Sequence, residues 1–441
     1  FLFVLSCSLA HFRNFAFFPL TIHQTVEEKQ KMHVQKGGNM KRRIVSMVLA
    51  VFMLGSLFAP TKVNAAVSAE DYRAVWFSYY DFQKYVKTNK KNTGAAFTTY
   101  FSRVVDKCKS RGLNRIIVQV RPSGDALYNS SYFPTSEYIS GKQGRKISYD
   151  PLEIMVREAH RKGMKIEAWV NPYRVSFNTS YAKLYKNNQA RKWHESSDPA
   201  VRRNVLSYGG KLYYNPSKPE VRNLIINGVK EIVSNYDVDG IHMDDYFYPS
   251  FSSKNYKKSF DAAEYNASAE KKNGMGIKKY RRKQVNTLVK GIKSAIKSIK
   301  PNVVFGISPA GNIDSLNSKY SYYVNIKLWT NSTEYVDYIA PQIYWGFSHK
   351  TAPFAKVTDR WVDMVDQSKV KLYIGLPAYK MGHSSLGTTK AEKAELKNAK
   401  TLKKMFKYAV KKNTDGIIVF DYADLDKAAS VKLGKYLNKV Y

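Results

Sequence analysis

Eight short apolar segments, each ending in polar or aromatic residues, alternate with helical segments along most of this chain. The apolar segments are typical of strands and span residues 73–82, 115–124, 165–174, 238–247, 303–312, 336–345, 371–380 and 415–424. Amphipathic stripes lie between them. One helix is predicted to begin at Asp150 and Pro151, and another at a capping box formed by Ser217 and Glu220. This alternation predicts an α/β fold with a parallel sheet.

Two α/β architectures fit this order of elements. A doubly wound open sheet is expected to carry a glycine-rich phosphate loop after an early strand, and none is present. Eight strand–helix units over about 370 residues instead favour a single (β/α)8 TIM barrel at 66–441. Long loops follow strands 3 and 4, at 175–215 and 248–278. We expect them to wall a groove at the C-terminal face, where barrel enzymes keep their active sites.

Aromatic, carboxylate, amide and arginine side chains gather at the predicted C-terminal strand ends. The candidate substrate-binding residues are Arg121, Asn171, Tyr173, Arg174, His242, Tyr246, Asn312, Gln342, Tyr344 and Trp345. Aromatic faces stack on sugar rings, and amides and arginine bond hydroxyls, so the mixture indicates a polysaccharide site. No cluster has metal-ligand spacing, and no phosphate loop or G-x-S-x-G elbow is present, so we expect no metal and no cofactor. A lone histidine such as His242 also fits a hydrogen-bonded barrel residue.

The fourth predicted strand ends in "DGIHMDDYFYP" (239–249), where Asp244 and Asp245 are adjacent. Glycoside hydrolysis needs one group that protonates the leaving oxygen and another that supports the cationic anomeric carbon. Repulsion between adjacent carboxylates raises the pKa of one of them, which can then donate a proton while the other stays ionised. We therefore predict Asp244 and Asp245 as the catalytic residues. The structural alternative is a polar cap that accepts hydrogen bonds from nearby backbone amides.

From about Glu70 to Tyr441 the chain resembles the glycosyl hydrolase-like family 10 proteins, which are bacterial exported barrels. The resemblance lies in "RAVWFS", "GLNRIIVQVRPSGDALYNS", "GMKIEAWVNPYRV", "YYNPSKPEVRNLI", "VDGIHMDDYFYP", "GISPAGN" and "YIAPQIYWG". It implies a glycoside hydrolase barrel. Some members of the family are associated with cleaving peptidoglycan glycan strands that have been stripped of their peptides.

Two further resemblances bear on the residue roles. "DGIHMDD" is similar to the D-G-x-R-x-D motif of α-amylase-like barrels, which implies Asp244 as nucleophile and His242 in place of the arginine. Those enzymes carry an acid at the end of the fifth strand, whereas here that strand ends in "ISPAGN". The pair also resembles the adjacent acids of substrate-assisted N-acetylglucosaminidases. There the first acid orients the acetamido group that attacks the anomeric carbon, and the second protonates the glycosidic oxygen. Tyr344 resembles the tyrosine that supports the acetamido group in chitinase-like barrels.

Side chains alternate along a strand, so both acids can reach one site only if the strand ends or bulges there. Otherwise Asp81, Asp125 or Asp421 becomes the candidate acid. The first functional hypothesis is a hydrolase of an N-acetylated cell-wall glycan, in particular peptide-free peptidoglycan strands. The alternatives are a non-catalytic barrel that binds wall glycan or anionic polymer, and a hydrolase of another polysaccharide.

The segment from Met40 to Ala65 predicts a signal peptide. Basic residues at 41–43 precede an apolar run at 44–60, and small residues near Ala65 mark the expected cleavage point. The run is short for a membrane span, so we expect no stable span after cleavage; an uncleaved anchor is the alternative. Residues 1–39 are expected to be a translated leader without structure. The predicted location is outside a bacterial cell, secreted or associated with the cell wall.

The chain is strongly basic, with 72 Lys and Arg against 35 Asp and Glu and a formal net charge of +37. Such a charge attracts polyanions. With an export signal, the expected partners are the polysaccharide substrate and an anionic cell-wall polymer, and not nucleic acid. The even spread of lysines also fits a simple contribution to solubility. We expect a monomer.

Overall fold

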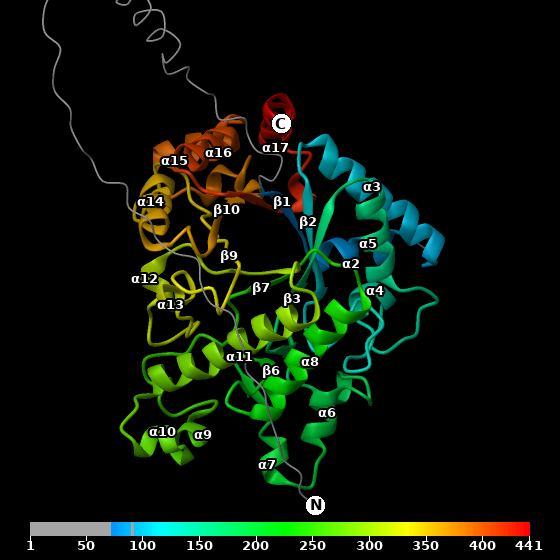
Figure 1. The fold of residues 1–441 in the computed structure, drawn as a ribbon, viewed down its shortest axis with the longest axis vertical. Coiled ribbons are helices and arrows are strands. Elements are labelled where there is room, and N and C mark those ends of the chain that lie inside the picture. Colours follow the sequence, from blue (N-terminus) through cyan, green and yellow to red (C-terminus); the bar gives the residue numbers. More distant parts are fainter. Residues whose placement is uncertain (1–71, 90–91) are drawn as a thin grey trace, which may run out of the picture. The chain divides into compact units, whose positions relative to one another are not determined.

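The computed structural model describes residues 72–89 and 92–441, all within the unit Val67–Tyr441. Eight parallel strands close into a barrel in the order β1, β2, β3, β7, β8, β9, β10 and β11, and β11 pairs with β1 (Figure 1). They are β1 (Tyr72–Phe77), β2 (Arg115–Arg121), β3 (Lys165–Val170), β7 (Gly240–Asp244), β8 (Val304–Ser308), β9 (Tyr338–Ile339), β10 (Lys371–Pro377) and β11 (Gly416–Phe420). The predicted (β/α)8 TIM barrel is confirmed, and each predicted strand overlaps one of these. The predicted leader and signal peptide lie outside the described residues.

Helices occupy every connection between consecutive barrel strands, and one more follows β11. They are α2 (Tyr79–Thr88), α3 (Gly94–Ser110), α4 (Glu137–Ser140), α5 (Pro151–Arg161), α6 (Gln189–His194), α7 (Pro199–Arg202), α8 (Pro219–Asn235), α9 (Ala262–Ala267), α10 (Ala269–Lys272), α11 (Ile277–Ile299), α12 (Ile313–Leu316), α13 (Ile326–Trp329), α14 (Phe354–Met364), α15 (Lys390–Lys397), α16 (Thr401–Lys411) and α17 (Ala428–Val440). Short 3-10 helices lie at Tyr181–Lys183, Ala378–Lys380, Ser384–Leu386 and Tyr422–Asp424. Among the described residues, no helix combines the length and the apolar character needed to cross a bilayer.

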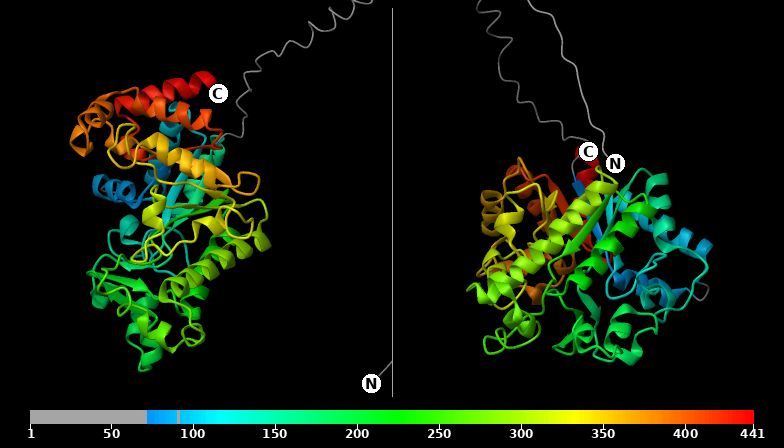
Figure 2. Two further views of the ribbon diagram at one scale, coloured as in Figure 1. Left: turned by 90° about the vertical axis from the view of Figure 1, so that its left-hand side faces the viewer. Right: turned by 60° about the horizontal axis from the view of Figure 1, so that its bottom comes forward.

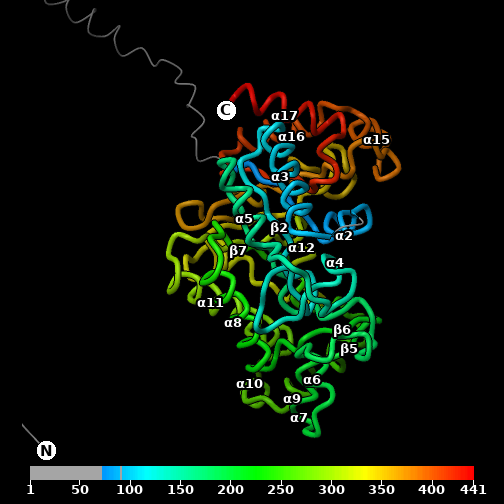
Figure 3. The backbone as a smooth tube through the Cα atoms, turned by 90° about the vertical axis from the view of Figure 1, so that its right-hand side faces the viewer, coloured from blue at the N-terminus to red at the C-terminus, as the bar shows by residue number. Residues whose placement is uncertain are grey.

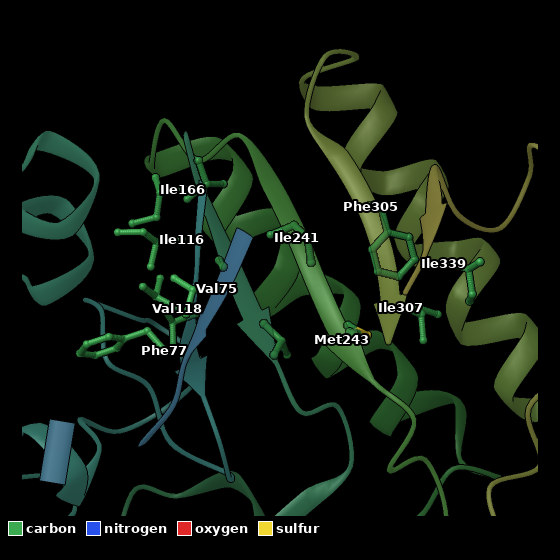
Figure 4. Close-up of a cluster of buried hydrophobic side chains, with 14 of the residues drawn as sticks. Val75, Phe77, Ile116, Val118, Ile166, Ile241, Met243, Phe305, Ile307 and Ile339 are labelled. Carbon is green, nitrogen blue, oxygen red and sulfur yellow. The ribbon is translucent and has the colours of Figure 1, made fainter. Parts of the chain in front are cut away.

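Alternate residues of each strand face two separate cores. The outward-facing set packs against the surrounding helices, and Figure 4 shows part of it on β1, β2, β3, β7, β8 and β9: Val75, Phe77, Ile116, Val118, Ile166, Ile241, Met243, Phe305, Ile307 and Ile339. The inward-facing set forms a second cluster that includes Trp76, Trp169 and Tyr338. Successive side chains point to opposite faces of the strand. Because both faces are buried, the strands form near-continuous apolar runs in the sequence.

The barrel interior pairs large side chains with glycines. The most crowded position is Gly306 on β8, where an added Cβ atom would lie about 2 Å from the ring of Tyr338 on β9. Only glycine leaves room for that ring. Tyr338 in turn reaches Glu167, which is fully buried in the barrel and paired with Arg115 at 2.9 Å. The interior is therefore a packed core with a polar centre.

Two long insertions follow β3 and β7, as predicted. The first contains a small antiparallel sheet in the order β4 (Arg174–Ser176), β6 (Lys211–Tyr214), β5 (Val205–Tyr208). Gly209 and Gly210, both at positive φ (53° and 75°), form the two-residue turn between β5 and β6. Figures 1 and 3 place this sheet beside α6, α7, α9 and α10, and the two views of Figure 2 show the same green segments gathered together. Both insertions thus lie over one end of the barrel.

Of the two helix starts predicted from capping residues, one is confirmed and one is wrong. The Asp150 side chain accepts hydrogen bonds from the backbone N–H groups of Leu152 and Glu153, so the predicted start of α5 is confirmed. The capping box of Ser217 and Glu220 is wrong. Helix α8 begins at Pro219 without a side-chain cap, and the Ser217 hydroxyl donates to Asp261 at 2.9 Å instead. The Ser217 hydroxyl thus bonds to the carboxylate of Asp261, which is distant in sequence, and not to a backbone group at the start of α8.

Candidate active site

A cleft of about 560 Å³ opens at the C-terminal end of the barrel strands. Its walls come from the ends of β2, β3, β7 and β11, the start of α2, the small sheet and the loop after β7. The lining residues are mostly aromatic or polar: Ser78, Tyr79, Tyr80, Gln119, Trp169, Arg174, Phe177, Tyr208, Gly209, Lys211, Tyr213, Asp244, Tyr246, Tyr248, Pro249, Ser250, Tyr322 and Phe420. An open groove of this composition suits a sugar polymer, because aromatic faces stack on pyranose rings.

A smaller pocket of about 100 Å³ adjoins the cleft toward the barrel axis. Its lining residues are Trp76, Trp169, Asp244, Tyr246, Ser308, Gln342, Tyr344 and Phe420. Four of these residues also line the cleft, so the two spaces share a boundary. Asp244 is the one carboxylic acid among the described residues that line either space.

Asp244 is the last residue of β7, and its side chain is 3% exposed. One carboxylate oxygen accepts a hydrogen bond from the Asn171 side-chain amide at 2.5 Å, and Asn171 accepts one from Gln119. Burial raises the pKa of Asp244, while the positive charge of Arg174 and the Asn171 bond act in the opposite direction. Asn171 therefore positions Asp244, and the neighbouring Arg174 favours its ionised form.

Asp245 follows the last residue of β7, so the strand ends between the two acids. Its carboxylate accepts a hydrogen bond from the Ala310 backbone N–H at 2.7 Å, in the loop after β8. Burial, with a smaller contribution from the charge of Asp244, raises the pKa of Asp245 to about 7. It lines neither the cleft nor the pocket. The two acids thus have different partners, and Asp245 retains its proton to a much higher pH than an exposed aspartic acid.

His242 lies one layer below Asp244 inside the barrel and is fully buried. The Trp76 indole N–H donates to Nε2 of His242 at 3.0 Å, which leaves the proton on Nδ1, 2.7 Å from the Tyr338 hydroxyl. Tyr338 donates in turn to Glu167 at 2.6 Å. Burial lowers the pKa of His242 to about 3, so the ring is neutral. This geometry favours a structural role for His242, beneath the site and out of contact with a ligand in the cleft.

The other predicted binding residues divide into two groups. Arg174 and Tyr246 line the cleft, and Tyr246, Gln342 and Tyr344 line the pocket. The remaining residues lie outside both linings. Arg121 donates to the backbone carbonyls of Asn171 and Pro172, Tyr173 is fully buried against Phe247, Asn312 caps α12, and Trp345 packs beside His349. These four hold strand ends and loops in place.

The three alternative acids also lie outside the two linings. Asp81 caps α2 through the Ser78 backbone, and burial raises its pKa to about 6. Asp125 is buried beside Gln143, and burial raises its pKa to about 6 as well. Burial, followed by the charges of Asp81 and Asp424, raises the pKa of Asp421 to about 8. Among the predicted acids, only Asp244 reaches the open space.

Several lining residues were absent from the predicted site. Four of them belong to the small sheet or directly follow it: Phe177, after β4, and Tyr208, Lys211 and Tyr213 in the hairpin of β5 and β6. The hairpin sequence "VLSYGGKLYY" (205–214) carries a recognisable signal, because alternating residues flank Gly-Gly. Trp169 lies two residues before Asn171 and so shares its face of the strand. Among the described residues, no group of three His, Cys, Asp or Glu side chains is arranged to hold a metal ion.

Comparisons with known proteins agree on one family. The family described as "Glycosyl hydrolase-like 10" matches residues 71–391. Glycosyl hydrolase YngK of Bacillus subtilis is 35% identical over 359 residues, covering 78% of this chain and 67% of the relative. Glycosyl hydrolase DigH of Escherichia coli K12 is 33% identical over 337 residues, covering 72% of this chain and 75% of the relative.

Solved structures share the fold at low sequence identity. The PgaB (BpsB) glycoside hydrolase domain from Bordetella bronchiseptica is 11% identical with a TM-score of 0.53, over 82% of this chain and 98% of that one. A β-galactosidase from Rahnella sp. R3 is 12% identical with a TM-score of 0.51, over 85% of this chain and 57% of that one. Sequence and fold together show that this chain belongs to the glycosyl hydrolase-like 10 family.

Proposed function

We propose that this protein is a secreted glycoside hydrolase that cleaves an N-acetylated cell-wall glycan, namely peptide-free peptidoglycan strands. The observation that carries the proposal is the position of Asp244: a buried carboxylate at the boundary of an aromatic cleft and a polar pocket, held by Asn171. Membership of a family whose relatives are named glycosyl hydrolases supports the same reaction class.

In this proposal Asp244 and Asp245 divide the catalytic roles. Asp244 orients the substrate acetamido group, whose oxygen attacks the anomeric carbon, or it is itself the nucleophile. Asp245 protonates the leaving glycosidic oxygen. With a pKa of about 7, a large share of Asp245 still carries its proton near neutral pH, as a general acid requires. Because Asp245 lies behind the lining, the protonation step needs the loop that follows β7 to shift or a water to relay the proton.

Sugar positioning falls to the residues that line the two spaces. Tyr246 is 52% exposed and lies between cleft and pocket, so its ring is available for stacking. Gln342 and Tyr344 line the pocket next to Asp244, where an acetamido group would sit. Tyr344 packs against Phe420 and Tyr379, with ring centroids 5.7 and 5.6 Å apart, which fixes its orientation.

A non-catalytic glycan-binding barrel is the second candidate function. Two observations favour it: β8, which ends at Ser308, contributes no acid to the pocket, and Asp245 lies outside the lining. A binding barrel would retain the stacking residues and the basic charge and would release no products. Hydrolysis of another polysaccharide is the third candidate.

Product analysis separates these functions. The purified chain, beginning at Ala66, is incubated with peptide-free peptidoglycan strands, and the soluble fraction is analysed by mass spectrometry. The proposal predicts short N-acetylated oligosaccharides and new reducing ends. Salt-sensitive sedimentation with the glycan and no new reducing ends would support the binding barrel. Fragments from an unrelated glucan alone would support the third candidate.

The location outside the cell is part of the proposal and has its own test. After expression in a bacterial host, the N-terminal sequence of the exported protein is expected to begin at Ala66. An exported or membrane-held form that still carries residues 40–65 would instead indicate an uncleaved anchor.

A further inference from the structure

Two positive charges flank one aromatic ring on the wall of the cleft. Arg174 begins β4, Lys211 begins the neighbouring strand β6, and Phe177 directly follows β4. The Arg174 guanidinium carbon lies 4.5 Å from the centre of the Phe177 ring, and the Lys211 ammonium lies 5.6 Å from it. All three residues line the cleft, and Phe177 is 40% exposed. The small sheet therefore presents a cationic aromatic platform to the ligand.

No carboxylate of the described residues forms an ion pair with Arg174 or Lys211, although the charge of Arg174 acts on the nearby Asp244. The Arg174 Nε donates to the backbone carbonyl of Pro122 at 2.7 Å, which fixes the side chain without cancelling its charge. Within the described part of the chain, neither cation has a carboxylate within ion-pair distance. Two cations held beside one ring repel each other, so an anionic group between them would relieve an unfavourable arrangement.

A neutral sugar ring does not account for both cations. Tyr79, Tyr80 and Tyr246 already offer stacking surface in the same cleft. Burial raises the pKa of Asp244 and the charge of Arg174 opposes this rise, which gives Arg174 one role in the proposed reaction. Among the residues that the structure describes, Lys211 has no carboxylate within ion-pair distance. Its position is best explained by a ligand that brings its own negative charge.

We propose that Arg174, Lys211 and Phe177 form a subsite for a sugar that bears a free carboxylate. This inference rests on the proposed function and sharpens it. In peptidoglycan every second sugar carries a lactyl ether, whose carboxyl group is an uncharged amide while a peptide is attached. Removal of the peptide releases a carboxylate, which can pair with Arg174 and Lys211 while its sugar packs on Phe177. The subsite therefore selects stripped strands by charge.

Equilibrium binding tests this subsite without relying on turnover. The Asp244→Asn chain is titrated with peptide-free peptidoglycan strands, and with the same strands after chemical reduction of their carboxyl groups to alcohols. The two ligands share length, linkage and acetamido groups. The carboxylate strands are expected to bind about tenfold more tightly, the range of one or two charge-assisted contacts in a partly exposed site.

Variants then assign the preference to the platform. Adding Lys211→Gln is expected to lower the ratio of the two dissociation constants about fivefold, and Lys211→Arg to restore it. Lys435→Gln removes one exposed positive charge on α17 and controls for net charge. A ratio near one in the parent chain, or equal losses with Lys211→Gln and Lys435→Gln, would overturn the subsite. Absence of hydrolysis by the wild-type chain would refute the proposed function and leave this comparison standing.

Discussion

Asp244 and Asp245 are adjacent in sequence but bond to different neighbours. Asp244 contacts Asn171, which follows β3, and Asp245 contacts the backbone after β8. Strand β7 ends at Asp244. The chain turns there, so Asp245 does not simply alternate to the opposite face of the strand. One acid meets the open space and the other is enclosed. This difference of environment sets two distinct protonation behaviours in neighbouring residues of the same type.

The raised pKa of Asp245 predicts the pH dependence of hydrolysis. The proposed general acid must be protonated, so kcat/KM on peptide-free strands is expected to fall above about pH 7, tenfold per pH unit. Rates measured from pH 4 to 9 at constant ionic strength check this limb. A rate that stays constant up to about pH 8 and falls above it would favour Asp421, whose pKa is about 8, as the acid. A rate that stays constant up to pH 9 would exclude both aspartic acids.

Because the pKa of Asp245 is raised in the folded chain, its contribution to the free energy of unfolding depends on pH. Its pKa in the folded chain, about 7, lies above its ordinary value of 3.8. The contribution of protonated Asp245 to the free energy of unfolding is therefore complete below pH 3.8 and is lost as the pH rises to 7. Asp245→Asn does not titrate. Its free energy of unfolding relative to wild type is expected to rise by on the order of 2–3 kcal/mol between pH 5 and pH 8.

Urea unfolding of both proteins at the two pH values measures this difference. A difference between variant and wild type that is the same at pH 5 and pH 8 would mean that Asp245 titrates alike in the folded and unfolded chains.

At the scale of elements, a buried ion pair anchors the long insertion after β7. Arg281 on α11 and Asp261 in the insertion are both fully buried and lie 2.7 Å apart. Arg281 also donates to the backbone carbonyl of Tyr256, while Asp261 accepts from the Tyr248 hydroxyl at 2.8 Å. Tyr248 lines the cleft. The pair thus connects the outer helix layer with the wall of the candidate site.

Breaking this pair is expected to be far more damaging than breaking an exposed one. Arg281→Met leaves the Asp261 charge buried without its partner, at a cost of about 3–5 kcal/mol in the free energy of unfolding. Glu334→Gln breaks the Lys290–Glu334 pair, whose side chains are more than half exposed, and should change the free energy of unfolding very little. Chemical denaturation compares the two variants. Equal losses would contradict the anchoring role of the buried pair.

For the whole molecule, the barrel could be predicted from sequence because its signal is repeated. Each strand is buried on both faces, so eight apolar runs recur along the chain, and their alternation with helical segments favours a barrel. The weakest strand, β9, shows the limit: only Tyr338 and Ile339 pair regularly within the predicted 336–345. Beyond them Gln342 makes only isolated bridges to Ala310 and Gly375, and Gln342 and Tyr344 line the pocket. No local pattern in the sequence marks the end of the regular pairing.

The candidate site was less predictable because it depends on contacts between distant segments. Strand-end position identified Asp244, Arg174 and Tyr246. The same rule also selected Arg121 and Tyr173, which point into the packing between strands and helices. Lys211 and Phe177 join the site only because the β5–β6 hairpin pairs with β4, 30 or more residues away along the chain. Loop length identified the two insertions that wall the cleft, but it did not show which of their residues face the cleft.

The charge of the whole molecule matters for where it acts. Of its charged residues, 64 basic and 33 acidic ones follow Ala65, so the barrel itself remains strongly basic. In the proposed function, this positive charge would attract the protein to an anionic cell wall and to a glycan that carries free carboxylates. Arg174 and Lys211 in the cleft would then attract the same carboxylates at short range, as the surface charge does at longer range.

The central claim, that Asp244 is a catalytic residue of a cell-wall glycan hydrolase, is tested most directly by the rate of reducing-end release. Wild type, Asp244→Asn and Asp363→Asn are compared on peptide-free peptidoglycan strands, with matched folding checked by circular dichroism. Asp363 is an exposed acid on α14 and controls for the lost charge. The account predicts that Asp244→Asn lowers kcat about 10³-fold while Asp363→Asn retains the wild-type rate. An Asp244→Asn chain that releases fragments at the wild-type rate would contradict it.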